Sequence, residues 1–306
     1  MKMKIYFLTF LVLLCVSCKD KKVSTVQAEQ NVSTIDTTFQ KIAENALNNQ
    51  LEVLNADAGI AIVMDVETGT IKAVANKNLS ENDTIETASL FKVPCMIVAL
   101  DDSIVSPNDK IDTGDGILNY KGVTIKDITS DKGGYGKITA EQVIMFSSNV
   151  GTAKIILQGY ENNPNKFIDG LHNLGFVDIP KDRPITDYLS LGSGIKIPAI
   201  EMLQFYNSIA NGTVKCSPTT LEAIKKMLVN VVNNNTGTGY PAKSDIIKIA
   251  GKTGGLKNTA LFCGYFPADS PKYSCIVIID NPKNGNISGG VMAGTVLKEI
   301  AENISQ

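Results

Sequence analysis

A serine and a lysine in the first third of the chain could support nucleophilic catalysis. Ser89 and Lys92 lie three positions apart, and an apolar run from Val93 to Leu100 follows them. This spacing predicts a helix that carries the hydroxyl and the amine on one face. A serine hydroxyl is a weak nucleophile without a base, and a neutral lysine amine can serve as that base. The pattern is common by chance, so its meaning depends on the rest of the chain.

A second polar cluster, Ser147-Ser148-Asn149, stands between two segments with helical periodicity. Ser147 could relay a proton, and the side-chain amide of Asn149 could hold a peptide bond. Serine and asparagine are also common helix N-caps, so a capping role is the alternative. The two roles are compatible.

A third cluster, Lys252-Thr253-Gly254-Gly255, lies at the predicted end of a strand over 246–253. Lys252 offers a cation, Thr253 a hydroxyl, and Gly254 a backbone that a ligand can approach closely. A solvated turn is the alternative, but the apolar strands around the cluster favour a functional role. A second cation near Lys92, together with burial, would lower the pKa of that amine.

The single histidine leaves lysine as the available base. His172 precedes Gly175 in a predicted helix end, where a surface or C-terminal histidine is the favoured interpretation. A catalytic triad or a zinc site would have to be built around this one residue. We therefore expect no metal site and no cofactor.

The cysteines show no Cys-x-x-Cys spacing, which argues against a metal cluster. Cys263 and Cys275 fall on two consecutive predicted strands. A disulfide between them is conceivable in an oxidising compartment, but two buried free thiols are the favoured interpretation.

The order of elements predicts one α+β domain, an α/β sandwich. Its sheet is mainly antiparallel, has five strands drawn from both chain ends, is flanked by helices, and encloses a helical insert subdomain. The predicted strands are 58–64, 70–75, 246–253, 259–266 and 273–279. The predicted helices are 38–54, 89–102, 139–146, 150–160, 165–174, 197–209, 217–232 and 291–304, and the segments 76–87 and 106–136 are expected to be loops or irregular structure.

The N-terminus resembles a bacterial lipoprotein signal. Two lysines precede the apolar run from Ile5 to Val16, which is short for a bilayer span, and Ser17-Cys18 follows. We expect a signal peptide over 1–17, lipidation of Cys18, a flexible tether over 18–37 and the folded domain over 38–306. An ordinary signal peptide or an uncleaved anchor is the alternative. The 29 basic and 31 acidic residues nearly balance, so we expect no nucleic-acid partner.

Serine with lysine, then Ser-x-Asn, then Lys-Thr-Gly, in this order, is typical of penicillin-binding proteins and serine β-lactamases. From about Ala56 onward the chain resembles the transpeptidase domain of class B penicillin-binding proteins. Further matching segments are Val105-Ser106-Pro107, Ile111 to Gly114, Ser147 to Lys154, Gly237-Thr238-Gly239 and Gly264 to Ala268. The stretch before Ala56 is too short for the non-catalytic module of that class, so we expect a form truncated at the N-terminus.

The resemblance implies acyl transfer at the D-Ala-D-Ala bond of peptidoglycan stem peptides. Ser89 would be the nucleophile, Lys92 the base, and Ser147 the proton relay to the leaving amine. Asn149 would hold a substrate amide, Lys252 would set the electrostatics, and Thr253, next to Gly254, would bind the terminal carboxylate. The backbone N–H groups of Ser89 and Gly255 would form the oxyanion hole.

The same resemblance implies inhibition by β-lactams and an exported domain at the periplasmic face of a bacterial membrane, anchored through its lipid. Gly255 departs from the family, which usually has a second threonine there to grip the carboxylate. The alternatives are a D,D-carboxypeptidase, a serine β-lactamase, and a catalytically weak penicillin-recognising sensor or scaffold.

Overall fold

A computed structural model describes residues 34–181 and 195–306 of the chain. The expected signal peptide, Cys18 and the expected tether as far as Ser33 lie outside the described residues. Within the described ranges, no helix combines the length and the apolar character needed to cross a membrane.

The domain is built on one antiparallel sheet of five strands in the order β2-β1-β11-β10-β9. The strands are β1 (Ala58–Asp65), β2 (Ile71–Lys77), β9 (Ala250–Leu256), β10 (Thr259–Phe266) and β11 (Tyr273–Asp280). The N-terminal hairpin β1–β2 joins the three C-terminal strands where β1 pairs with β11, and Ala58 lies opposite Asp280. This arrangement confirms the predicted fold class.

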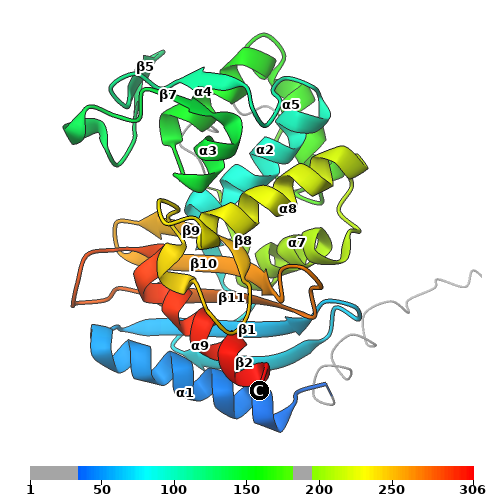
Figure 1. Ribbon diagram of the computed structural model, residues 1–306, viewed down its shortest axis with the longest axis vertical. Helices are drawn as coiled ribbons and strands as arrows, with labels where there is room; N and C mark the ends of the chain where they lie inside the picture. Colours follow the sequence, from blue (N-terminus) through cyan, green and yellow to red (C-terminus); the bar gives the residue numbers. More distant parts are fainter. Residues whose placement is uncertain (1–33, 182–194) are drawn as a thin grey trace, which may run out of the picture. The chain divides into compact units, whose positions relative to one another are not determined.

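Helices cover both faces of the sheet because the side chains of its central strands are almost entirely buried. Helices α1 (Thr37–Leu54) and α9 (Gly294–Ile304) pack together on one face (Figure 1). A π-helical turn, Gly289–Ala293, leads into α9. Helix α7 (Ala199–Asn211) contacts β1, β10 and β11. The catalytic candidates must therefore lie at an end or an edge of the sheet.

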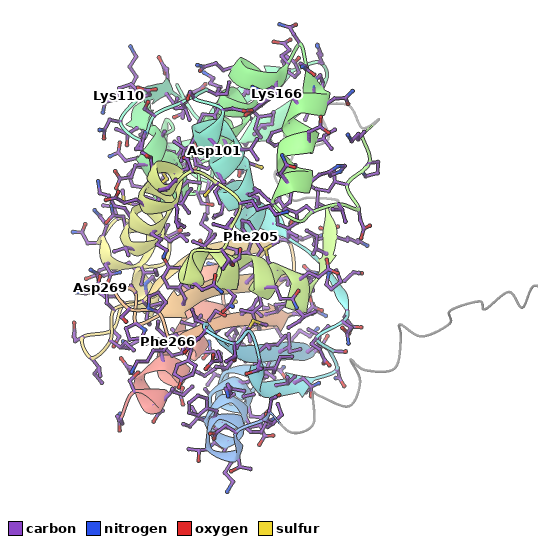
Figure 2. All side chains as sticks on the ribbon, turned by 90° about the vertical axis from the view of Figure 1, so that its right-hand side faces the viewer. Asp101, Lys110, Lys166, Phe205, Phe266 and Asp269 are labelled. Atoms are coloured by element: carbon purple, nitrogen blue, oxygen red, sulfur yellow. The ribbon has the colours of Figure 1, made fainter. Side chains whose placement is uncertain are left out.

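A helical part lies beyond strand β9 (Figure 1). It contains α2 (Lys92–Asp101), α3 (Ala140–Met145), α4 (Asn149–Tyr160), α5 (Pro164–Asn173) and α8 (Pro218–Asn233). Short strand pairs accompany the helices: β3 (Thr84–Glu86) with β8 (Lys196–Pro198), β4 (Lys110–Asp112) with β7 (Lys137–Thr139), and β5 (Ile117–Tyr120) with β6 (Val123–Lys126). In Figure 2, Lys110, Asp101 and Lys166 mark the helical part, and Phe266 and Asp269 mark the sheet.

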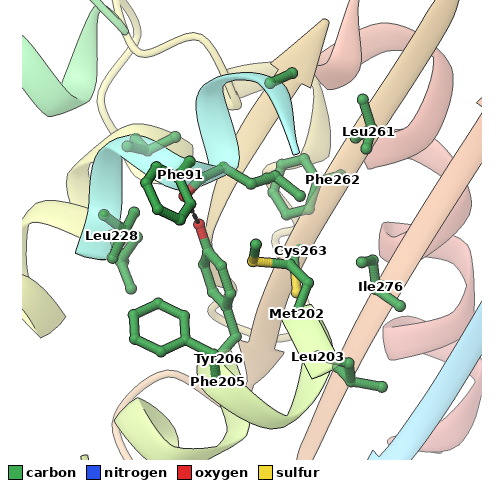
Figure 3. Packing of buried hydrophobic residues seen from close by; sticks show 14 of the residues in the cluster. Phe91, Met202, Leu203, Phe205, Tyr206, Leu228, Leu261, Phe262, Cys263 and Ile276 are labelled. Carbon is green, nitrogen blue, oxygen red and sulfur yellow. Dashed lines mark hydrogen bonds between the residues drawn. The ribbon is translucent and has the colours of Figure 1, made fainter. Parts of the chain in front are cut away.

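The core is continuous beneath the turn that carries Ser89. Tyr206 of α7 is fully buried and donates a hydrogen bond to the carbonyl oxygen of Leu90 at 3.1 Å (Figure 3). Phe91 is fully buried and packs edge-to-face on Phe176, with ring centroids 5.3 Å apart. This packing fixes the backbone on either side of the serine.

Several local predictions are confirmed. Thr139 caps α3, and Gln142 completes the capping box. Ser148, the middle residue of the second cluster, is the N-cap of α4 and accepts a hydrogen bond from the backbone N–H of Gly151. The capping alternative for that cluster is therefore correct for its middle serine.

Three local predictions are wrong in detail. Ser89 lies on a short 3-10 turn, η1 (Ala88–Phe91), and the α-helix begins only at Lys92. The predicted loop over 76–87 contains strand β3, which pairs with β8. Strand β9 begins four residues later than the predicted strand start, so Lys252 lies inside the strand and not in a turn at its end.

Candidate active site

The 3-10 turn brings the first pair together. In this geometry residues at i and i+3 eclipse each other, and the Nζ of Lys92 lies 3.0 Å from the Oγ of Ser89. Ala88, directly before the serine, has a left-handed backbone with φ of 47°. This conformation is strained for a residue with a Cβ, and it persists because the side chain is buried in the core.

The amine of Lys92 is enclosed by oxygen atoms of the second cluster. Its Nζ lies 2.5 Å from the carbonyl oxygen of Ser147, 3.1 Å from the Ser147 Oγ and 2.6 Å from the Oδ1 of Asn149. Ser147 also has a left-handed backbone, with φ of 57°. This conformation lets both its carbonyl and its hydroxyl face the amine.

Lys252 reaches the same hydroxyl from the sheet. Its Nζ donates to the Ser147 Oγ at 2.8 Å and to the Thr253 carbonyl oxygen at 3.0 Å. Ser147 is therefore a bridge between the two amines. The Lys252 side chain is fully buried, which excludes the solvated-turn alternative for this cluster.

Burial shifts the proton equilibria of both amines. Desolvation lowers the pKa of Lys92 to about 7, although the negative charge of Asp127 acts in the opposite direction. Desolvation, followed by the nearby Lys92, lowers the pKa of Lys252 well below its usual value. A neutral amine is therefore accessible close to pH 7.

Hydrogen-bond counting gives the neutral Lys92 amine an orientation. A neutral amine has two N–H donors and one lone pair. The Ser147 carbonyl and the Asn149 Oδ1 can only accept, so they take both donors. The lone pair is then left for a hydroxyl hydrogen, and the hydroxyl of Ser89 is within reach.

Two residues near the site escaped the sequence analysis. The buried carboxylate of Asp127 accepts hydrogen bonds from the hydroxyl of Ser148 and from the backbone N–H groups of Asn149 and Val150, the last at 3.0 Å. Asp127 thus ties the loop after β6 to the start of α4. No local sequence signal distinguishes it from the other aspartates of that polar segment.

Thr238 is the second such residue, and its Oγ1 lies 2.8 Å from the Oγ1 of Thr253. It belongs to the Gly237-Thr238-Gly239 segment, so a signal for it was present in the sequence. The two hydroxyls form a small polar cluster beside Lys252.

The two glycines of the third cluster have different surroundings. A Cβ on Gly254 would lie 3.2 Å from the Cβ of Leu261 and 3.4 Å from Leu90, which leaves little room. Gly255 is exposed, and a Cβ there would meet only the Cγ2 of Ile287, at 3.7 Å. The backbone at Gly255 can therefore carry a side chain.

The remaining candidate residues take no part in this cluster. The Nε2 of His172, near the end of α5, lies 2.7 Å from the carbonyl oxygen of Ile179. Cys263 and Cys275 are free thiols, as favoured. They cannot pair across the sheet because Cys263 lies opposite Ile276, so the two thiols point to opposite faces. Among the described residues, no cluster of His, Cys, Asp and Glu could hold a metal ion.

The fold and this arrangement agree with the comparisons to known proteins. Residues 59–305 match the family of the penicillin binding protein transpeptidase domain, and the chain belongs to this family. Similar proteins include the peptidoglycan D,D-transpeptidase FtsI of Buchnera aphidicola, 26% identical over 88% of this chain. FtsI of Escherichia coli K12 is 25% identical over 90% of the chain.

A solved structure supports the same conclusion. The transpeptidase domain of Burkholderia pseudomallei penicillin-binding protein 3 is 26% identical, with a TM-score of 0.79 over 89% of this chain and 94% of that one. The alignments to the two FtsI proteins cover 56% of the length of each.

Proposed function

We propose that this chain is a serine D,D-transpeptidase of peptidoglycan synthesis that acts through an acyl-enzyme on Ser89. The observation that carries the proposal is the environment of Lys92. Its buried amine has a pKa of about 7, and two obligate acceptors orient it so that its lone pair is left for a hydroxyl proton. This is what a base for a serine nucleophile requires.

Acylation follows from the contacts. The Oγ of Ser89 attacks the carbonyl carbon between the two D-alanines while its proton passes to the Nζ of Lys92. The oxyanion forms opposite the backbone N–H groups of Ser89 and Gly255. The proton then passes through the Ser147 hydroxyl, which lies 3.1 Å from the Lys92 amine, to the nitrogen of the leaving D-alanine.

Substrate binding uses the groups around this path. Thr253, with the charge of Lys252 beside it, binds the terminal carboxylate, and the side chain of Asn149 binds an amide of the stem peptide. An acceptor amine then attacks the acyl-enzyme and restores Ser89, which gives a cross-link; attack by water gives a carboxypeptidase product. A β-lactam acylates the same serine.

Labelling with a fluorescent penicillin tests the nucleophile. We expect durable labelling of the chain, loss of labelling in Ser89→Ala, and unchanged labelling in the control Ser305→Ala. Rapid turnover of the drug would indicate a β-lactamase instead. Absence of labelling in folded protein would leave the sensor or scaffold alternative.

Product analysis tests the acceptor. The chain is incubated with a stem peptide ending in D-Ala-D-Ala and an amine acceptor, and the products are separated by mass. A cross-linked product supports the transpeptidase, whereas a product that has only lost its terminal D-alanine indicates the carboxypeptidase.

We further propose that residues 1–17 direct export, that Cys18 carries a lipid anchor, that 18–37 form a tether, and that the catalytic domain, 38–306, faces the periplasm. The sequence around Ser17-Cys18 supports this. Intact-mass analysis of protein from a membrane fraction should show a lipidated N-terminal cysteine, and Cys18→Ser should release the protein from that fraction. Membrane retention of unlipidated Cys18→Ser would contradict the anchor.

A further inference from the structure

The proposed function fixes the direction in which a substrate runs along β9, and the inference below rests on it. The terminal carboxylate lies at Thr253, and the reacting carbonyl lies between Ser89 and the N–H of Gly255. Positions along a strand advance by about 3.3 Å per residue. The residue before the reacting D-alanine is therefore directed towards Leu256 and Lys257.

A cavity of about 660 Å³ opens at that end of the strand. Leu256 and Lys257 border it on one side, and Ile85 and Glu86 of β3 border it on the other. Glu86 precedes the nucleophile Ser89 by three residues. The cavity is thus adjacent, along both of these segments, to the residues proposed for the oxyanion hole.

The wall of this cavity is apolar at its base. Ile278 is buried, and Ile85, Leu79 and Leu256 are half-buried. Such a surface favours the methylene groups of an aliphatic side chain.

Charges of both signs surround the apolar base. Glu86 and Asp280 are half-buried, and Lys196 and Lys257 are exposed. Glu86 lies opposite Lys196 in the β3–β8 pair, yet neither forms an ion pair within the described ranges. The same holds for Lys257 and Asp280, although Asp280 accepts a hydrogen bond from Thr259 at 2.7 Å. These charges remain available to a ligand that carries both an ammonium and a carboxylate.

We propose that this cavity binds the side chain of the residue preceding the reacting D-alanine, and that it selects an aliphatic side chain ending in both an ammonium and a carboxylate group. The methylene groups lie on the apolar base. The ammonium pairs with Glu86 and Asp280, and the carboxylate pairs with Lys257 and Lys196. The cavity would then determine which stem peptide serves as the donor.

The test compares three peptides X-D-Ala-D-Ala in the acylation reaction. X carries either an ammonium and a carboxylate on its side chain, an ammonium alone as in lysine, or a methyl group as in alanine. We expect kcat/KM to rise in the order alanine, lysine, zwitterionic residue, by about fivefold at each step, because a half-exposed ion pair contributes about this much.

Matched variants assign the charges. Lys257→Gln should lower kcat/KM about fivefold for the zwitterionic peptide alone, and Glu86→Gln should lower it for the zwitterionic and lysine peptides. Lys41→Gln and Glu52→Gln, on exposed positions of α1, are the controls. Equal kcat/KM for the three peptides, or equal effects of Lys257→Gln and Lys41→Gln, would overturn the proposal.

Penicillin labelling separates this failure from failure of the proposed function. A penicillin has no residue at position X, so it should label Lys257→Gln and Glu86→Gln at the wild-type rate. Labelling of Ser89 together with no peptide preference refutes only the cavity assignment. Absence of both labelling and peptide acylation refutes the proposed function.

Discussion

At the scale of single residues, the decisive group is the Lys92 amine, because the proposed reaction needs its neutral form. Burial lowers the pKa of Lys92 to about 7, so the neutral fraction grows as the pH rises through that value. We expect the rate of penicillin acylation to increase over the same interval and then to level. Stopped-flow or gel-based acylation rates measured from about pH 6 to about pH 8 check this. A flat profile would mean that Lys92 is not the base.

Replacing the amine is the complementary experiment at this scale. Lys92→Ala should abolish acylation and leave the fold intact, since a small apolar side chain is tolerated in a buried position more readily than an unpaired charge. Circular dichroism reports the fold, and penicillin labelling reports the reaction. Lys137→Ala, an exposed lysine on β7, is the control. Near-normal acylation in Lys92→Ala would refute its assignment as the base.

Gly255 offers a gain-of-function prediction. A side chain at this position meets only Ile287, at 3.7 Å, so Gly255→Thr should fold and place a hydroxyl near the carboxylate site. One added hydrogen bond to a charged group at an exposed site contributes about 1 kcal/mol, or roughly fivefold in the second-order acylation rate. Gly255→Val has nearly the same shape without the hydroxyl. Equal rates for the two variants would show that the hydroxyl does not reach the carboxylate.

The residue-level contacts were predictable where the three clusters are concerned. The Ser89–Lys92 pair follows from local spacing, and a second cation near Lys92 was expected. The bridging position of Ser147 was not, because it depends on a left-handed backbone and on the approach of β9 from a distant part of the chain. Asp127 also escaped, since its role comes only from the folding of its loop onto α4.

At the scale of elements, the start of α4 depends on the buried carboxylate of Asp127. Asp127→Asn keeps the shape and a carbonyl acceptor but removes the charge, and should cost about 1 kcal/mol of unfolding free energy. Asp127→Ala leaves the backbone N–H groups of Asn149 and Val150 unpaired, and should cost about 3 kcal/mol. Urea denaturation measures both.

The same pair of variants separates electrostatics from structure. The charge of Asp127 raises the pKa of Lys92, so Asp127→Asn should lower that pKa and move the rising part of the acylation profile to lower pH. A purely structural role would reduce the rate without moving the profile. An unchanged profile in a folded Asp127→Asn protein would therefore contradict an electrostatic influence on Lys92.

Element boundaries were less predictable than element types. The periodic helices and the strands β1, β10 and β11 were expected within about two residues. Strand β9 was expected to start at position 246 and to end at Thr253, whereas it continues to Leu256 because Gly254 and Gly255 pair with Leu261 and Ala260. Glycines have low strand propensity, so only the tertiary pairing reveals this extension.

At the scale of the whole molecule, the sheet joins the two ends of the domain into one unit. Strand β1 is an interior strand between β2 and β11, so its amides cannot open without disrupting the C-terminal strands. Native-state hydrogen exchange should give β1 and β11 the same opening free energy, close to that of global unfolding. Distinctly faster exchange in β1 than in β11 would show that the N-terminal hairpin opens independently.

The pairing of Ala58 with Asp280 also has a consequence for how the protein is made. A ribosome delivers the chain from its N-terminus, so the hairpin β1–β2 emerges long before the strand that completes it. Until β11 arrives, one edge of β1 presents unpaired backbone groups and an apolar surface, which is the kind of edge that associates with other chains. Newly made protein should therefore depend on chaperones that bind extended apolar segments, and it becomes independent of them only when its last strands have been released.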